Sequence, residues 1–152
     1  MNLSFRAYLE SDKESCLSLF DENCPDYFAP NERGDYEAYL ASNPAEYELC
    51  LQNNNTVGAF GLFKESEQVA DLNWIFLSLK AQGSGIGSIM MQKAKSRAVD
   101  LGVEVIQIAT SHKAYKFFEK QGAVSVSEME DGWGPGMHRI DMKLQIVPTN
   151  KS

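Results

Sequence analysis

Cysteine, histidine and long apolar runs are all scarce in this chain of 152 residues. The three cysteines, Cys16, Cys24 and Cys50, show no Cys-x-x-Cys spacing, and no secretory signal pattern accompanies them. We therefore expect reduced thiols in a cytoplasmic protein rather than a disulfide framework. His112 and His138 are the only histidines and do not show a metal-ligand spacing, so we expect no bound metal.

Membrane and nucleic acid partners are disfavoured by what the chain lacks. No apolar run approaches the roughly 20 residues needed to cross a bilayer. Basic residues are few, since 14 Lys and Arg face 21 Asp and Glu and the net charge is −7. Binding to a phosphate backbone requires a basic surface, so we expect neither a nucleic acid nor a membrane as partner.

The charge is unevenly distributed along the chain. Residues 80–120 carry seven basic and three acidic side chains, and the remainder of the chain sums to −11. One interpretation places an anionic cofactor on the basic part and a cationic acceptor near the acidic part. The alternative is two ordinary solvated faces.

The most informative stretch is residues 82–88, with the sequence Gln-Gly-Ser-Gly-Ile-Gly-Ser. It lies between an apolar run and an amphipathic run, which predicts a strand, a glycine turn and a helix start. Glycines at alternate positions let a ligand approach the backbone and permit φ/ψ values that point successive N–H groups one way. The free N–H groups and the dipole of the helix's first turn favour a phosphate or pyrophosphate there.

Other nucleotide motifs fit this turn poorly. No Lys-Ser/Thr pair follows Gly87, as a Walker A motif requires, and the glycine spacing of the dinucleotide fingerprint is absent. These differences disfavour ATP, GTP and NAD. A tight strand-to-helix connection without any ligand remains the alternative interpretation.

Two segments resemble signatures of one superfamily. Residues 82–87 are similar to the Q/R-x-x-G-x-G/A signature of the GNAT N-acetyltransferases. Residues 114–123, Ala-Tyr-Lys-Phe-Phe-Glu-Lys-Gln-Gly-Ala, resemble that family's A-x-x-F/L-Y-E-K-x-G-F segment. Their order and separation match the family's, so the pair is more specific than either alone. The resemblance covers about residues 3–144, with the N-terminal third matched in element order only.

The resemblance implies a single domain over residues 1–146, followed by a short tail at 147–152. The implied fold is of the α/β (α+β) class. In this GNAT-type fold a mixed, largely antiparallel sheet of about six or seven strands is flanked by about four helices, with a parallel strand pair splayed around the cofactor. The residue pattern agrees, because an apolar strand at 69–79, a helix at 86–101 and a β-branched strand at 103–109 predict a parallel pair. The glycine-rich segment 131–136 predicts irregular structure, either a flap over the acceptor or a mobile turn.

The resemblance also implies acetyl-CoA (coenzyme A) as cofactor. The pyrophosphate would bind the glycine turn, and the backbone of the strand around residues 75–77 would hold the pantetheine amides and supply the oxyanion donor. The residues expected to bind the cofactor are Ile75, Phe76, Leu77, Gln82, Gly83, Ser84, Gly85, Ile86, Gly87, Ser88 and Ser111.

The implied acceptor is an amine on a small molecule or a peptide. The acidic part of the chain indicates a cationic acceptor. In the superfamily the loop after the first helix shapes the acceptor pocket, so we expect Tyr27, Phe28 and Glu32 to contact the acceptor, together with Trp133. Alternatively, Tyr27 and Phe28 only cover the edge of the core. A homodimer is compatible with the resemblance.

The proton donor is where the sequence departs from the family. Many members carry a Tyr at the position that Phe118 occupies here, and Phe has no proton to donate. Tyr115 lies three residues earlier in the same helix, and we expect it to be the catalytic acid. The alternative is that Tyr115 only packs and that water protonates the thiolate, which is already a reasonable leaving group.

The activity implied by the resemblance is transfer of an acetyl group from acetyl-CoA to an amine, directly and within a ternary complex. Two other functions remain open. One is a catalytically silent acyl-CoA-binding or regulatory domain of the same fold. The other is a phosphate-ligand module that has no relation to CoA.

Overall fold

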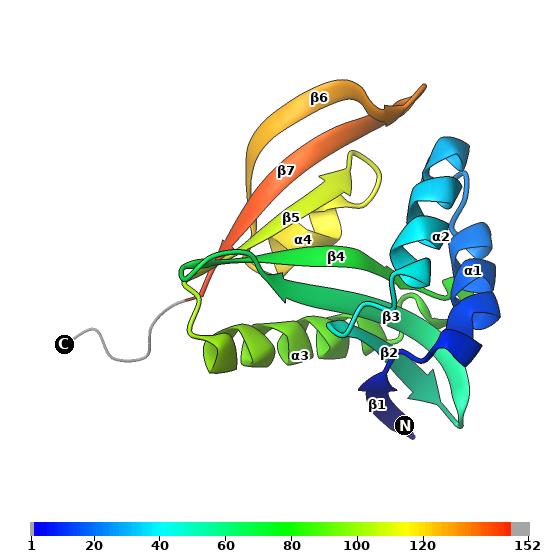
Figure 1. Ribbon diagram of the computed structural model, residues 1–152. Helices are drawn as coiled ribbons and strands as arrows, with labels where there is room; N and C mark the ends of the chain where they lie inside the picture. Colours follow the sequence, from blue (N-terminus) through cyan, green and yellow to red (C-terminus); the bar gives the residue numbers. More distant parts are fainter. Residues whose placement is uncertain (1, 147–152) are drawn as a thin grey trace.

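A seven-stranded sheet, in the order β1-β2-β3-β4-β5-β7-β6, runs through the computed structural model (Figure 1). The structure describes residues 2–146, so the expected tail at 147–152 lies outside the described residues. The strands are β1 (Leu3–Ala7), β2 (Tyr47–Gln52), β3 (Asn55–Lys64), β4 (Val69–Leu77), β5 (Val105–Ser111), β6 (Val124–Gly134) and β7 (Met137–Gln145). The α-helices of the described part are α1 (Lys13–Glu22), α2 (Arg33–Ala41), α3 (Ile86–Leu101) and α4 (Tyr115–Lys120), and the short 3-10 turns are η1 (Glu10–Asp12), η2 (Pro30–Glu32) and η3 (Leu79–Ala81).

One pair of strands is parallel and the other pairs are antiparallel. The parallel pair is β4 with β5, joined by the crossover helix α3, as the sequence predicts. Its register runs only from Val69 opposite Val105 to Leu72 opposite Ile108. Beyond that point the two strands diverge, which Figure 1 shows as a widening gap between β4 and β5. The expected fold, a mixed and largely antiparallel sheet with a splayed parallel pair, is thus confirmed.

An extra residue in β4 lies at the start of this divergence. Ala59 pairs with Phe76 and Gly61 pairs with Asn73, so two steps along β3 correspond to three steps along β4. Trp74, within these three steps, has φ 46°, in the left-handed region that non-glycine residues rarely adopt. A β-bulge of this kind inserts one unpaired residue and bends its strand.

The bulge exchanges the two faces of β4. Before it, Ala70 and Leu72 pack in the cluster that includes α3. After it, Phe76 packs in the other cluster, with α1 and α2, while Leu77 packs toward α3. Side chains alternate along a strand, so without the extra residue at Trp74 the Phe76 side chain would face the same side as Ala70 and Leu72, and Leu77 would face the opposite side.

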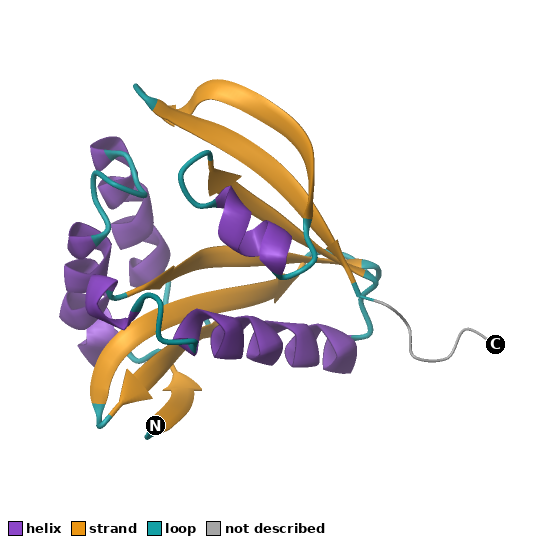
Figure 2. Cartoon of the chain, turned by 180° about the vertical axis from the view of Figure 1, so that it is seen from behind, coloured by secondary structure: helices purple, strands orange, loops and turns teal. Residues whose placement is uncertain are grey.

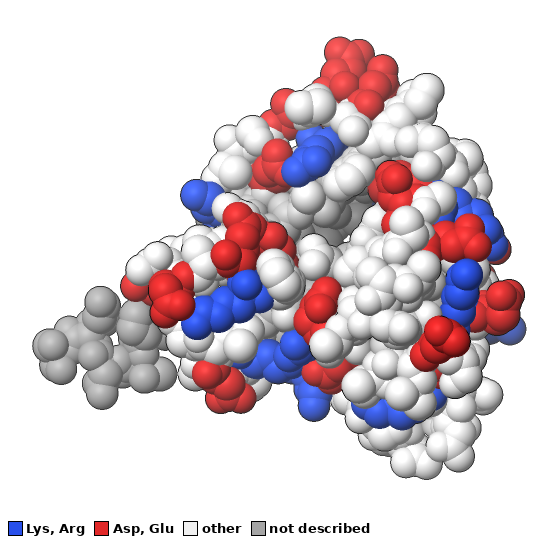
Figure 3. All heavy atoms as spheres, viewed as in Figure 1, with Lys and Arg blue, Asp and Glu red and all other residues white. Residues whose placement is uncertain are grey.

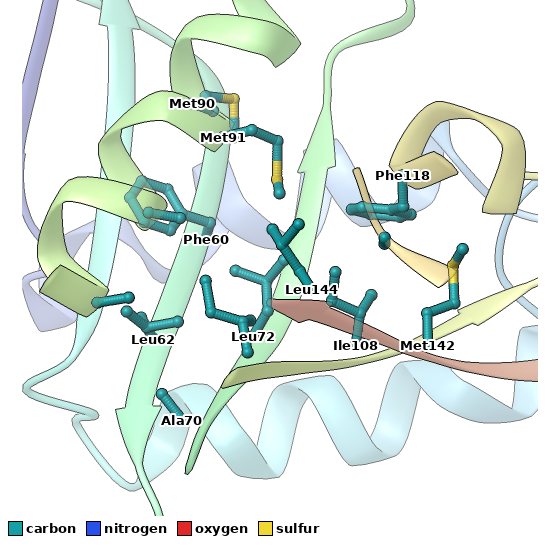
Figure 4. Packing of buried hydrophobic residues seen from close by; sticks show 14 of the residues in the cluster. Phe60, Leu62, Ala70, Leu72, Met90, Met91, Ile108, Phe118, Met142 and Leu144 are labelled. Carbon is teal, nitrogen blue, oxygen red and sulfur yellow. The ribbon is translucent and has the colours of Figure 1, made fainter. Parts of the chain in front are cut away.

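The sheet is covered on both faces. Figure 2 shows α3 and α4 in front of it, and α1 and α2 pack at the end where β4 and β5 diverge (Figures 1 and 2). On the α3 side, Met90 and Met91 of the helix and Phe118 of α4 meet strand residues such as Leu72 and Ile108 (Figure 4). The buried residues of α3 fasten the helix that follows the glycine turn; they are Ile86, Met90, Met91, Ala94 and Ala98.

The hairpin of β6 and β7 corrects one expectation. The glycine-rich composition of segment 131–136 predicts irregular structure, yet β6 continues to Gly134 and β7 begins at Met137. The ladder is irregular between Met129 and Gly134, and only the tip forms a turn. Side-chain anchoring outweighs the local glycine preference here, because the indole Nε1 of Trp133 donates a 2.7 Å hydrogen bond to the carbonyl of Thr110.

Truncating a side chain should lower the free energy of unfolding more in the centre of the sheet than at its edge. Ile108 in the centre of the sheet is 2% exposed, whereas Val126 on the edge strand β6 is 55% exposed. Ile108→Ala is expected to lower the free energy of unfolding by roughly 2–5 kcal/mol, and Val126→Ala by about 0.5 kcal/mol or less. Urea unfolding of the two variants checks this, and equal losses would contradict the assignment of the core.

Candidate active site

A cavity of about 880 Å³ occupies the place where β4 and β5 diverge. Its walls come from the segment between α1 and α2, the bulged half of β4, the glycine turn, the end of β5, α4 and the tip of β6. Elements that are far apart in the sequence therefore meet at one site. Most of the residues singled out from the sequence line it.

The glycine turn adopts the backbone that its composition predicts. Gly83 and Gly85 have φ of 80° and 90°, and a Cβ at either would meet no atom within 4 Å. Gly87 is close to the Phe117 ring, 3.1 Å from where its Cβ would be. Since α3 begins at Ile86, the N–H groups of its first turn have no helical acceptor and form an anion site beside the turn.

Not every residue of the turn lines the cavity with its side chain. Gln82 and Ser88 line it, and the three glycines line it with their backbone. The Ser84 hydroxyl instead donates a hydrogen bond to the Ala81 carbonyl, and the Ile86 side chain is buried in the core. These two residues hold the turn in shape, and any contact they make with an anion is through the backbone.

The edge of β4 presents free backbone groups to the cavity. Ile75, Phe76 and Leu77 all line it. The N–H of Ser78 donates to the Val57 carbonyl on β3 at 2.7 Å, and backbone polar groups alternate along a strand. The N–H groups of Leu77 and Ile75 therefore point away from β3, toward the gap that β5 has left. The Leu77 carbonyl accepts a 3.1 Å hydrogen bond from the buried Asn23 amide.

A chain of buried hydroxyls holds the bulge. The Tyr47 hydroxyl donates to the Trp74 carbonyl at 2.7 Å, and it lies 2.9 Å from the Tyr36 hydroxyl. Because a carbonyl can only accept, the Tyr47 proton is used there and Tyr36 is the donor of the second bond. Burial raises the pKa of both Tyr groups far above its usual value, so both keep their protons.

The acceptor residues expected from the sequence also line the cavity. Tyr27, Phe28 and Glu32 come from the α1–α2 segment, and Trp133 comes from the hairpin on the opposite side. Phe28 also packs on Phe20 and Trp74, with ring centroids 5.1 and 6.1 Å apart. Phe28 therefore both covers the edge of the core and lines the cavity.

Glu32 is the one acidic side chain lining the cavity in the described part of the chain. It is 4% exposed, and its Oε2 accepts a 2.8 Å hydrogen bond from the Ala29 N–H. Burial raises its pKa to about 7, against the smaller opposing effect of that hydrogen bond. A carboxylate held in this way exchanges its proton near neutral pH.

Tyr115 lies apart from the main cavity. It does not line this cavity but a second one, with His112, Ser125 and Ser127. The residues of the α4 segment that face the main cavity are Ala114, Phe117, Phe118, Lys120 and Gln121. Three residues along a helix turn the side chain by about 60°, which is enough here to place Tyr115 against other neighbours. Its location does not support a role as proton donor.

Ser111 lines the cavity, together with three polar residues that the sequence analysis did not single out. Ser111 is buried, and its Oγ accepts a hydrogen bond from the Lys113 N–H. Lys113 and Lys120 are the basic residues of the wall, and Asn23 is a polar one. The excess of basic residues between 80 and 120 is a signal for the two lysines, whereas nothing in the sequence marks Asn23.

A comparison with protein families decides the classification. The model described as "Acetyltransferase (GNAT) family" matches residues 16–123, which is more than half of the chain. The chain belongs to this acetyltransferase family. The matched segment of this GNAT protein includes most of α1, the bulged β4, the glycine turn and α4. No curated protein sequence matches the chain at a significant level.

Solved structures share the fold at low sequence identity. Ard1 from Thermoplasma volcanium is 14% identical with a TM-score of 0.82, over 97% of this chain and 100% of that one. The ribosomal-protein-S18-alanine N-acetyltransferase from Escherichia coli is 14% identical with a TM-score of 0.78, over 99% and 97%. An aminoglycoside 6'-N-acetyltransferase in complex with coenzyme A is 15% identical with a TM-score of 0.76, over 99% and 100%.

Within residues 2–146 no three His, Cys, Asp or Glu side chains gather in a way that could hold a metal ion. His112 and His138 stack on each other, with ring centroids 4.4 Å apart. None of the helices described is long and apolar enough to cross a membrane.

Two Tyr→Phe variants test the contribution of the buried hydroxyl chain to stability. Tyr47→Phe removes the donor to the Trp74 carbonyl and leaves the Tyr36 hydroxyl without its partner, so the free energy of unfolding should fall by roughly 1–3 kcal/mol. Tyr8 packs beside Tyr47, but its buried hydroxyl has no hydrogen-bond partner among the described residues. Tyr8→Phe should therefore cost about 0.5 kcal/mol or less. Chemical unfolding measures both, and equal destabilisation would contradict the role of the Tyr47 bond.

Proposed function

We propose that this protein is an acetyl-CoA-dependent N-acetyltransferase that transfers the acetyl group directly to an amine in a ternary complex. The observation that carries the proposal is that the glycine turn and the free edge of β4 open into one cavity. The first is an anion site of the kind that holds a pyrophosphate, and the second offers N–H groups to an amide chain and to a carbonyl oxygen. Acetyl-CoA contains both kinds of group, and the related aminoglycoside 6'-N-acetyltransferase was solved with coenzyme A.

In this proposal the cofactor lies along one path through the cavity. Its pyrophosphate accepts hydrogen bonds from the backbone at Gly83, Gly85 and Gly87, with Lys113 and Lys120 as nearby cations. Its pantetheine arm passes between Ile75–Leu77 and α4. The thioester would then lie beside the bulge, near the part of the cavity that Tyr27, Phe28, Glu32 and Trp133 line.

In this proposal the reaction needs backbone N–H groups and water rather than catalytic side chains. An acceptor ammonium gives up one proton to water, and the neutral amine attacks the thioester carbonyl carbon; the attacking nitrogen loses a second proton to water as the amide forms. A C–N bond forms as the C–S bond breaks, and a backbone N–H of β4 at Leu77 or Ile75 stabilises the oxyanion in between. The departing thiolate takes a proton from water, since thiols ionise close to neutral pH and the family's Tyr position is Phe118.

Family membership leaves one rival, a silent acyl-CoA-binding or regulatory domain. The buried Glu32 at the far end of the cavity favours the enzyme, because a domain that only holds CoA needs no charged group there. Release of free thiol from acetyl-CoA in the presence of amines separates the two. CoA binding without any amine-dependent thiol release would support the silent domain.

Two further expectations stay predictions. The three cysteines are free, which is what a reducing, cytoplasmic location would produce, and that location is part of the proposal. The homodimer compatible with the resemblance also stays a prediction.

Gly85→Asp tests the glycine turn, with a matched control at the other end of α3. Gly85 and Gly102 both have left-handed φ, and a Cβ at either meets nothing within 4 Å. Both Asp variants should therefore remain folded with a similar backbone strain of roughly 1 kcal/mol. Gly85→Asp places a negative charge where the pyrophosphate binds and should weaken CoA binding by about 100-fold or more, whereas Gly102→Asp should not.

Isothermal titration calorimetry with CoA provides the measurement. Circular dichroism of both variants controls for folding. If folded Gly85→Asp binds CoA as tightly as the wild type does, the pyrophosphate does not bind this turn.

A further inference from the structure

We propose that the acceptor is a small primary amine that carries one positive charge, no acidic group and an apolar body, bound between Glu32 and the aromatic side chains beside it. This inference rests on the proposed function and names its substrate class. It selects one class among protein N-termini, lysine side chains, polyamines, amino acids and aminoglycosides, all of which fit an N-acetyltransferase fold.

The walls of the acceptor end are aromatic. Tyr27 and Phe28 come from the α1–α2 segment, Trp74 from the bulge and Trp133 from the hairpin. Phe28 and Trp74 stack, with an interplanar angle of 28°. Flat aromatic faces bury an apolar body well, and their negative quadrupoles attract a cation.

At the acceptor end of the cavity the lining charge is negative. The charged residues lining the cavity in the described chain are Glu32, Lys113 and Lys120, and both lysines belong to the segment from β5 through α4, on the cofactor side. Arg139 lies near the acceptor end, but its guanidinium covers the Trp133 ring at 4.9 Å and its Nε donates to Asp141. An acceptor carboxylate or phosphate would therefore be desolvated there without a cationic partner.

Glu32 lacks a partner for its charge. Its Oε2 accepts the Ala29 N–H, but no Lys or Arg of the described chain pairs with it. A buried carboxylate in this state is costly when ionised, which is why burial raises its pKa to about 7. An acceptor ammonium supplies the missing charge, and one carboxylate matches one ammonium rather than a polycation.

A bridge limits the size of the acceptor. The Asn31 amide donates to the Trp133 carbonyl at 2.8 Å, so the α1–α2 segment and the hairpin are joined across the cavity. Gly134 packs so closely on this segment that a Cβ there would lie 2.9 Å from the Ala29 Cβ. The Trp133 indole is fixed in turn by Thr110. Figure 3 shows the hollow that remains between the hairpin and the helices. It suits a small molecule better than an extended peptide.

An acceptor panel at saturating acetyl-CoA tests the inference through the rate of thiol release. The panel contains phenethylamine, phenylalanine, spermidine, a tetrapeptide with an N-terminal Phe, and kanamycin. We expect kcat/KM with phenethylamine to exceed that with each of the others by about 10-fold or more. Phenylalanine is the matched control, because it adds only the carboxylate.

Two variants test the named groups. Glu32→Gln should raise the KM for phenethylamine by about 10-fold or more while CoA affinity stays unchanged. Glu37→Gln on α2, whose half-exposed side chain pairs with Lys13 and Arg33, should change neither. In the wild type that KM should fall as pH rises through about 7, because Glu32 loses its proton and gains its charge. This step should be absent from Glu32→Gln. Asn31→Ala removes the bridge and should raise kcat/KM for the tetrapeptide.

The outcomes are distinguishable. Turnover that is fastest with the peptide, spermidine, phenylalanine or kanamycin overturns the inference and leaves the proposed function standing. A KM for phenethylamine that is the same in Glu32→Gln and wild type also overturns it. Tight CoA binding with no turnover of any panel member overturns the proposed function, and the inference with it.

Discussion

The site depends on the hydrogen bond by which Tyr47 holds the carbonyl of Trp74. Trp74 adopts a positive φ that a Trp side chain does not favour, and a residue in such a conformation costs roughly 1–3 kcal/mol unless its surroundings hold it. The Tyr36–Tyr47 pair holds it from the core, between α2 and β2. The packing of α2 and β2 in the N-terminal half of the protein thus maintains a bulge that β4 alone would not keep.

Both ends of the cavity follow from this bulge. Because β4 bends away from β5 after Leu72, its edge loses its partner strand and its N–H groups face open space. The same bend carries β4 into the glycine turn, so that the start of α3 faces the same space. On the other side it brings Trp74 against Phe28, and with it the segment that carries Glu32. Two lysines line the first end and one buried carboxylate lines the second, so within the described chain the two ends of this cavity differ in the sign of their charge.

The elements that depend on local pattern could be predicted from the sequence. The apolar stripe predicts a helix at 86–101 with the bounds that α3 shows, and the parallel pair follows from the crossover. The bulge could not be predicted, because no residue near Trp74 in the sequence favours a positive φ there. The hydrogen bond from Tyr47 that holds it spans 27 residues. The length of β6 escapes prediction for a similar reason, since its anchor, Thr110, lies on another strand. The location of Tyr115 in the second cavity could not be predicted either, because a spacing of three residues in a short helix does not specify which neighbours each side chain meets.

Amide hydrogen exchange followed by NMR, with and without CoA, tests the central claim most directly. The claim is that the free edge of β4 after Leu72 and the glycine turn bind one cofactor together. The amides of Ile75, Leu77 and the 83–88 turn should exchange more slowly when CoA is bound, while those of 69–72, already paired in the sheet, should change little. Slower exchange in the turn alone, with Ile75 and Leu77 unchanged at saturating CoA, would contradict the account.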